Sequence, residues 1–88
     1  MEEFFSIFNL INRNVVLNSN IIGKTKVGYD KKKDCINVQI ESLDRTSKTV
    51  ISIPSADLLI TDADIKVNRF ALEDFKNQFD EFLNNIKL

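Results

Sequence analysis

The chain has no histidine, no tryptophan and only one cysteine among its 88 residues. Histidine is the commonest general base and metal ligand, so its absence removes the Ser/His and Cys/His pairs on which nucleophilic catalysis usually depends. Cys35 alone cannot form an internal disulfide or a zinc site, and a lone thiol is typical of a reducing compartment. We therefore predict a cytoplasmic protein that is not an enzyme and that binds no cofactor and no metal.

Long hydrophobic runs are also missing. No apolar segment approaches the ~18 to 20 residues that a membrane-spanning helix needs, and the start Met1-Glu2-Glu3 is not a basic leader. The composition, with 43% hydrophobic and 28% charged residues, is that of a folded globular chain. The sequence thus predicts one domain that does not bind membranes and is too small for a large enclosed cofactor cavity.

The net charge is only −1, so no global field attracts nucleic acid or an anionic membrane. The distribution of charge is nevertheless uneven. Residues 13–48 hold eight basic and four acidic residues, whereas residues 49–88 hold four basic and seven acidic ones. The middle of the chain is mildly basic, and an attraction for an anionic partner should arise there.

Two short segments match part of a binding motif but lack residues that the motif requires. Gly23-Lys24-Thr25 has the end of a phosphate-binding P-loop, yet Asn18 stands where that loop needs its first glycine. Asp62 and Glu73 have the spacing of the first and last ligands of a calcium loop, but Lys66 occupies a position that needs an oxygen ligand. Neither segment therefore predicts a cofactor or metal site.

The clearest predicted element is an amphipathic helix near the C-terminus. Six apolar residues recur at helical spacings and polar residues fill the rest of the circumference. The apolar stripe consists of Leu72, Phe75, Phe79, Phe82, Leu83 and Ile86. Asn68 is a candidate N-cap before it. We expect the stripe to cover a sheet formed by the residues upstream.

A second helix is predicted for residues 3–13, because apolar residues recur there on one face. That face holds Phe4, Ile7, Phe8 and Ile11, and Phe5 and Leu10 widen it. Residues 15–17 are compatible with a last helical turn or with a short strand. The pattern does not choose between these two.

Alternating apolar and polar residues then predict three consecutive antiparallel strands, with polar turns at residues 30–34 and 44–47. The inward residues are Ile21, Thr25, Val27 and Tyr29 in the first strand, Ile36, Val38 and Ile40 in the second, and Thr49, Ile51 and Ile53 in the third. Pro54 ends the third strand because it lacks a backbone donor. Residues 55–67 fit either a short helix or a fourth strand.

Together these elements predict a single α+β domain over residues 1–88. Its expected order is an N-terminal helix, a three- or four-stranded antiparallel β-meander and a long C-terminal amphipathic helix, with both helices packed on one sheet face. The opposite sheet face and the turns would then be free to meet another molecule.

Seven basic residues fall on that outer face or in the turns, and we predict them as the partner-binding residues. They are Lys24, Lys26, Lys31, Lys32, Lys33, Arg45 and Lys48. The predicted function is that of a small protein-binding module, an inhibitor or modulator that occludes a partner surface, as immunity proteins and phage-encoded counter-defence proteins do. The alternative is a nucleic-acid-binding accessory protein that uses the same basic face.

Three apolar residues do not follow the pattern of their elements. Ile22 and Val50 are out of phase with the inward residues of their strands, and Phe70 lies opposite the apolar stripe of its helix. We expect them to pack as a second layer rather than to form a contact patch. The free edge of a three-stranded sheet also leaves a homodimer possible.

Overall fold

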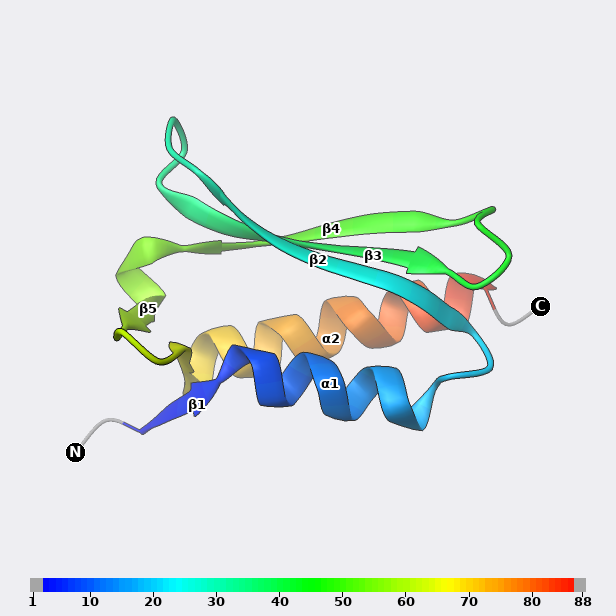
Figure 1. Ribbon diagram of the computed structural model, residues 1–88, viewed down its shortest axis with the longest axis horizontal. Coiled ribbons are helices and arrows are strands. Elements are labelled where there is room, and N and C mark those ends of the chain that lie inside the picture. The colour runs from blue at the N-terminus through cyan, green and yellow to red at the C-terminus, as the bar shows by residue number, and fades with distance from the viewer. Residues whose placement is uncertain (1–2, 87–88) are drawn as a thin grey trace.

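The computed structural model describes residues 3–86 and contains two helices and two antiparallel three-stranded sheets, an α+β architecture (Figure 1). One sheet has the strand order β2-β3-β4 and the other the order β1-β6-β5. In chain order the elements are β1 (Phe4–Ser6), α1 (Ile7–Leu17), β2 (Ile22–Asp30), β3 (Cys35–Ser42), β4 (Lys48–Pro54), a 3-10 turn (Ser55–Asp57), β5 (Leu58–Ile60), β6 (Ile65–Asn68) and α2 (Arg69–Ile86).

The meander of β2, β3 and β4 confirms the three strands that the alternating pattern predicts. Ile36 pairs with Ile53 and Val38 with Ile51, which places these buried side chains in neighbouring rows of one face. Pro54 is the last residue of β4 and leads into the 3-10 turn. Consecutive strands joined by polar turns therefore form the sheet as expected.

A β-bulge at Gly23 explains the out-of-phase position of Ile22. Ile22 pairs with Ser42 and Lys24 pairs with Glu41, so β2 has one extra residue at this point. The extra residue shifts the alternation by one and turns Ile22 into the core, where it is buried. The expectation that Ile22 packs inside is confirmed.

The second sheet was not expected, and it corrects the predicted helix over residues 3–13. Phe4–Ser6 forms strand β1, in which Phe5 pairs with Val67 of β6. The hydroxyl of Ser6 accepts a hydrogen bond from the amide of Asn9 at 3.2 Å, so Ser6 caps a helix that begins at Ile7. The helix continues to Leu17, which assigns residues 15–17 to its last turn.

Residues 55–67 adopt the strand alternative, although not in the meander. After one 3-10 turn, β5 and β6 pair antiparallel from Leu58 opposite Val67 to Ile60 opposite Ile65. They complete the sheet that β1 begins. Within residues 3–86 the meander therefore has no fourth strand. The apolar residues of segment 55–67 belong to the second, smaller sheet instead.

Helix α2 confirms the predicted C-terminal helix and its cap. The side-chain oxygen of Asn68 accepts a hydrogen bond from the amide of Ala71 at 2.9 Å. Five of the six residues of the apolar stripe are buried, and the sixth, Ile86, is half-buried. Phe75 and Phe79 stack with their ring centroids 6.0 Å apart. The stripe is the helical half of the core.

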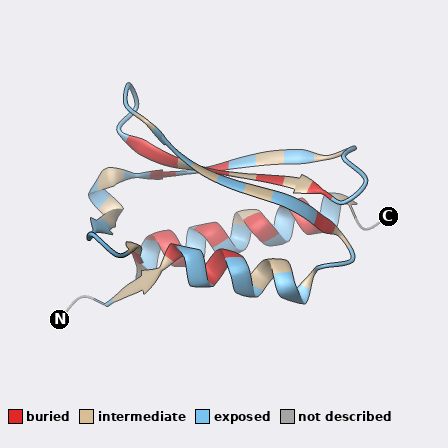
Figure 2. Ribbon diagram, viewed as in Figure 1, coloured by how far each residue is buried: buried red, intermediate tan, exposed pale blue. Residues whose placement is uncertain are grey.

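Figure 1 shows α1 and α2 lying beneath the β2-β3-β4 meander. The buried apolar residues of β3 and β4 form one cluster with those of both helices, and Figure 2 shows where they lie along these elements. No helix within residues 3–86 is long and apolar enough to span a membrane.

Four apolar side chains are more exposed than predicted. Phe8 is 48% exposed because the buried stripe of α1 is Ile7, Leu10 and Ile11. Tyr29, one residue from the end of β2, is 57% exposed. Val50 and Phe70 are 47% and 75% exposed, so the expectation that they pack inside is wrong.

Candidate functional site

The side of the meander that faces away from the helices is the best candidate for a functional surface. Because successive side chains of a strand alternate, the burial of Ile36, Val38 and Ile40 turns the residues between them outward. We call this surface the open face. It consists of Lys24, Lys26, Asn37, Gln39, Glu41, Lys48, Val50 and Ser52, as the strand register aligns them.

Three of the seven predicted basic residues meet on the open face. Lys24 and Lys48 pair with Glu41 from its two sides, and Lys26 stands opposite Gln39 in the next row. These residues line a shallow hollow of about 150 Å³. All three lysines are exposed, so their ammonium groups are available to an anionic partner.

The lysines of the open face are not neutralised by ion pairs. Within residues 3–86 the only ion pair joins Arg69 and Glu3, whose nitrogen and oxygen lie 3.4 Å apart. Glu41 is flanked by two lysines but forms no salt bridge with either in the described chain. One carboxylate among three ammonium groups leaves the open face with a net positive charge.

The other four predicted residues lie apart from this cluster. Lys31, Lys32 and Lys33 form the β2–β3 turn, whereas Arg45 lies in the β3–β4 turn at the opposite end of the sheet. The eight residues of β3 separate the two turns by roughly 26 Å. The seven basic residues therefore do not form one patch.

Polar contacts fix the β2–β3 turn. The carboxylate of Asp30 accepts hydrogen bonds from the amides of Lys32 and Lys33 at 3.0 and 3.2 Å. Asp34, whose φ is 50°, accepts from the hydroxyls of Ser55 and Tyr29, both at 2.6 Å. These bonds lower the pKa of Asp34, and the bond to Asp34 raises the pKa of Tyr29. Two carboxylates beside three lysines reduce the charge of this turn.

Asp44 organises the β3–β4 turn in a similar way. Its carboxylate accepts hydrogen bonds from the amide and hydroxyl of Thr46 at 3.0 and 2.7 Å and from the hydroxyl of Ser42 at 2.7 Å. These contacts lower the pKa of Asp44 to about 2. The turn also holds Arg45 at a φ of 65°, a conformation that the surrounding bonds must stabilise.

The lowered pKa of Asp44 predicts a loss of stability in acid. A group whose pKa is lower in the folded state stabilises the fold above its unfolded pKa, and this contribution disappears as the pH falls through the folded value. We expect the free energy of unfolding to decrease as the pH falls from about 5 to about 2. In Asp44→Asn this decrease should be smaller, as urea unfolding at several pH values will measure. An equal decrease in both proteins would contradict the prediction.

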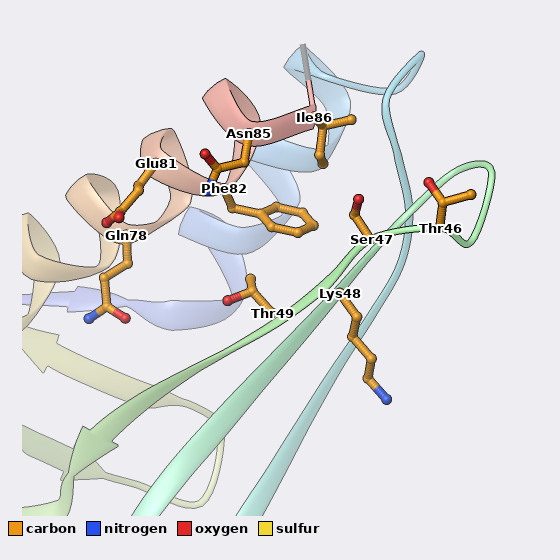
Figure 3. Close-up of a pocket in the computed structure, with 9 residues that line it drawn as sticks. All are labelled: Thr46, Ser47, Lys48, Thr49, Gln78, Glu81, Phe82, Asn85 and Ile86. Carbon is orange, nitrogen blue, oxygen red and sulfur yellow. The ribbon is translucent and has the colours of Figure 1, made fainter. Parts of the chain in front are cut away.

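A second hollow lies between the start of β4 and the C-terminal half of α2 (Figure 3). It has a volume of about 500 Å³, and Thr49, Gln78 and Phe82 are among its lining residues. Its polar groups are hydroxyls, amides, the carboxylate of Glu81 and the ammonium group of Lys48, which points away from the helix in Figure 3. These groups can form hydrogen bonds with a ligand. Among these described groups, no hydroxyl is hydrogen-bonded to the carboxylate of Glu81, as a nucleophile activated by a base would be.

The described chain also brings no metal-ligating set together. Residues 3–86 contain no group of three or more cysteine, aspartate and glutamate residues that could hold an ion. The thiol of Cys35 is buried and lies 3.7 Å from the side-chain oxygen of Asn37. The sequence places Cys35 on the polar side of β3, and burial there removes it from contact with a soluble reactant.

Sequence reasoning missed a third surface, a groove between α1 and the free edge of β2. The groove has a volume of about 380 Å³ and a mainly apolar lining. The exposed rings of Phe8 and Tyr29 lie there with Val27 and Ile65. Two large aromatic residues near the ends of their elements, Phe8 in α1 and Tyr29 in β2, could have indicated this groove. The periodicity of each element assigned both residues to the core.

Comparison with known proteins does not extend this description. No protein family, curated protein or solved structure is significantly similar to the chain. The fold and the open face therefore define a small α+β protein with two antiparallel sheets, and any functional conclusion depends on its surface chemistry.

Proposed function

We propose that this chain is a small non-catalytic protein-binding module that places its open face against an acidic surface of another protein and occludes that surface. An inhibitor or modulator of the immunity or counter-defence type works in this manner. The partner in this proposal is a protein, the compartment is the cytoplasm, and no cofactor takes part.

The observation that supports this proposal is the cluster of Lys24, Lys26 and Lys48 on a sheet face that the helices leave uncovered. Both helices contribute to the core on the other face of the meander. Three lysines without an ion pair in the described chain can meet carboxylates of a partner without first breaking internal contacts. Val50, exposed among them, adds apolar area to the same surface.

The charges elsewhere on the molecule favour one binding orientation. The exposed charged residues of α2 are four acidic ones, Glu73, Asp74, Asp80 and Glu81, and two basic ones, Lys76 and Arg69, of which Arg69 is paired with Glu3. An acidic partner is therefore repelled by the outer side of α2 and attracted by the open face. Such a dipolar arrangement raises the association rate and selects the docking face, and salt weakens both effects.

Affinity capture with charge-reversal variants tests the proposal. Tagged wild-type chain and Lys24→Glu/Lys48→Glu should be compared in lysate of the source organism, followed by Kd measurements with the purified partner. Reversal of two charges in the centre of the surface should weaken binding by about tenfold or more. Arg13→Glu/Lys76→Glu is the matched control, because it reverses two exposed charges on the helices.

The control variant should bind as the wild type does, and circular dichroism should show that both variants fold. A partner that binds the open-face variant as tightly as the wild type would refute the proposal. So would a partner that is lost only from the helix-side variant, because the docking surface would then lie on the helices.

A nucleic-acid accessory protein is the second candidate, and the exposure of Tyr29 favours it. The ring lies next to the turn that contains Lys31, Lys32 and Lys33, so an aromatic group and cations do occur together there. Against it, Asp30 and Asp34 bracket the lysines, and the hydroxyl of Tyr29 is bonded to Asp34. A titration with single-stranded DNA and RNA at low salt separates the two candidates.

A further inference from the structure

Strand β2 has an outer backbone edge with which no other strand of the described chain pairs. It is the first strand in the order β2-β3-β4, so β3 occupies only one of its sides. The strand has nine residues, and within residues 3–86 no other strand pairs with its outer edge. A long free edge is a template for another strand, because alternate amide and carbonyl groups point away from the sheet.

An apolar groove runs beside this edge. The side chains of Val27 and Tyr29 face α1 across the groove from Phe8 and Ile11. Phe8 and Tyr29 are the largest exposed side chains of α1 and β2, and both lie in this groove. A strand added to β2 would bring its own inward side chains over these rings and remove them from water.

We propose that a second copy of this chain pairs with β2, so that two β2 strands meet antiparallel about a two-fold axis at Val27. In this register Val27 stands opposite Val27, Thr25 opposite Tyr29 and Lys26 opposite Gly28 of the second copy. Lys24 stands opposite Asp30 of the second copy, and the symmetry makes this pair twice. Seven residues of each β2 take part, all on the C-terminal side of the bulge at Gly23.

Charge and paired length together select this register over its neighbours. Directly opposite residues in an antiparallel pair share one face, so a symmetric register must be centred on a residue. Centring on Lys26 would place two lysines directly opposite each other, which is destabilising. Centring on Gly28 would leave only five residues of β2 paired before Lys31 begins the turn. The register about Val27 is the longest one beyond the bulge without a like-charge pair.

The other edge of the meander is less suited to a second copy. Strand β4 ends in Pro54, which has no backbone donor, and the chain turns at once into the 3-10 segment. The groove beside β4 is lined mainly by polar groups of Ser47, Gln78, Glu81 and Asn85. Its side chains are already solvated, so covering them gains little.

The pairing would join two meanders into one six-stranded sheet. A two-fold axis perpendicular to the sheet keeps both open faces on the same side. The lysines of two copies would then lie on one continuous surface. The inference is distinguishable from the proposed function, because Lys24 lies on both the open face and the β2 edge whereas Lys48, on β4, lies on the open face alone.

Sedimentation equilibrium of the full chain tests the inference. The wild type should show a mass that rises with concentration from 10.1 kDa toward twice that value. Lys24→Asp places an aspartate opposite Asp30 of the second copy and should raise the dissociation constant about tenfold or more. Lys48→Asp makes the same charge change on the open face but on β4, so it should leave the dissociation constant unchanged.

Disulfide cross-linking tests the register. In a Cys35→Ser background, Val27→Cys should form a covalent dimer on mild oxidation, because directly opposite Cα atoms lie about 4.5 to 5.5 Å apart. Lys24→Cys should not, because the two copies of residue 24 would be about 20 Å apart along the strands.

Each outcome decides the inference. A wild type that stays monomeric at every concentration refutes it, and the edge would then be open to a strand of another protein. A dimer that Lys48→Asp weakens as much as Lys24→Asp also refutes it, as does cross-linking through residue 24 but not through residue 27. A partner that binds Lys24→Glu/Lys48→Glu as tightly as the wild type, while the wild type dimerises as expected, would refute the proposed function alone.

Discussion

Replacing Phe75 with alanine is expected to destabilise the protein by about 3 to 5 kcal/mol, the largest effect of any single truncation we propose. The side chain is completely buried in the centre of the stripe on α2 and stacks against Phe79 at 6.0 Å. Its removal leaves a cavity in the core cluster that α2 forms with β3 and β4. Small domains have a total stability of about 5 to 15 kcal/mol, so the variant should be close to unfolding.

Urea unfolding monitored by circular dichroism measures this effect, with Phe70→Ala as the matched control. Phe70 occupies the same helix but is exposed, so its truncation should change stability by about 0.5 kcal/mol or less. If Phe75→Ala does not fold, Phe75→Leu retains part of the volume and still gives a measurable loss. Equal stability of the Phe75 and Phe70 variants would show that α2 does not dock through its apolar stripe.

Helix α2 was predictable from the sequence because its buried residues, such as Phe75, repeat at helical spacings, whereas the exposed Phe70 does not fit that repeat. A long helix that covers a core needs a repeated apolar stripe, and six residues at helical spacings define one without ambiguity. The cap at Asn68 is local to the same segment. Both features depend on near neighbours in the sequence, which periodicity analysis reads directly.

The second sheet was not predictable for the opposite reason. Phe4–Ser6 and Ile65–Asn68 pair across some sixty residues, and three or four residues are too few to show a period of two. Phe4 and Phe5 also extend the apolar face of the helix that follows, so the helical pattern absorbed them. Only the hydroxyl of Ser6, a good N-cap, marked the true start of α1.

The candidate site was predictable in part. Strand alternation correctly placed Lys24, Lys26 and Lys48 on the outer side of the meander, because the inward isoleucines of β3 fix the faces of its neighbours. The turn residues were grouped with them only because they are close in sequence. The eight residues of β3 separate the two turns, a distance that the predicted strand already implied but that grouping the residues by charge left out.

The bulge at Gly23 supports the prediction with the second largest effect. Gly23→Ala should destabilise the protein by about 1 to 3 kcal/mol, the usual range for overpacking. A Cβ atom at this position would lie 2.9 Å from the Cα of Leu43 and 3.1 Å from the carbonyl oxygen of Ser42. Both are backbone atoms, so relief requires the bulge to open. Opening it weakens the 2.7 Å bond from the amide of Leu43 to the carbonyl of Ile21.

Gly28→Ala is the matched control, because Gly28 lies on the same strand and a Cβ there would meet no atom within 4 Å. Neither glycine has a positive φ, so backbone strain on adding a Cβ atom does not separate the two variants, whereas the space around that atom does. Alanine has less conformational freedom than glycine in the unfolded chain, so Gly28→Ala should be neutral or slightly stabilising. Urea unfolding of the two variants should therefore give shifts of opposite sign or a clear loss for Gly23→Ala alone. If both variants have the stability of the wild type, the close approach of β2 to Leu43 does not exist in solution, and the inward turn of Ile22 needs another cause.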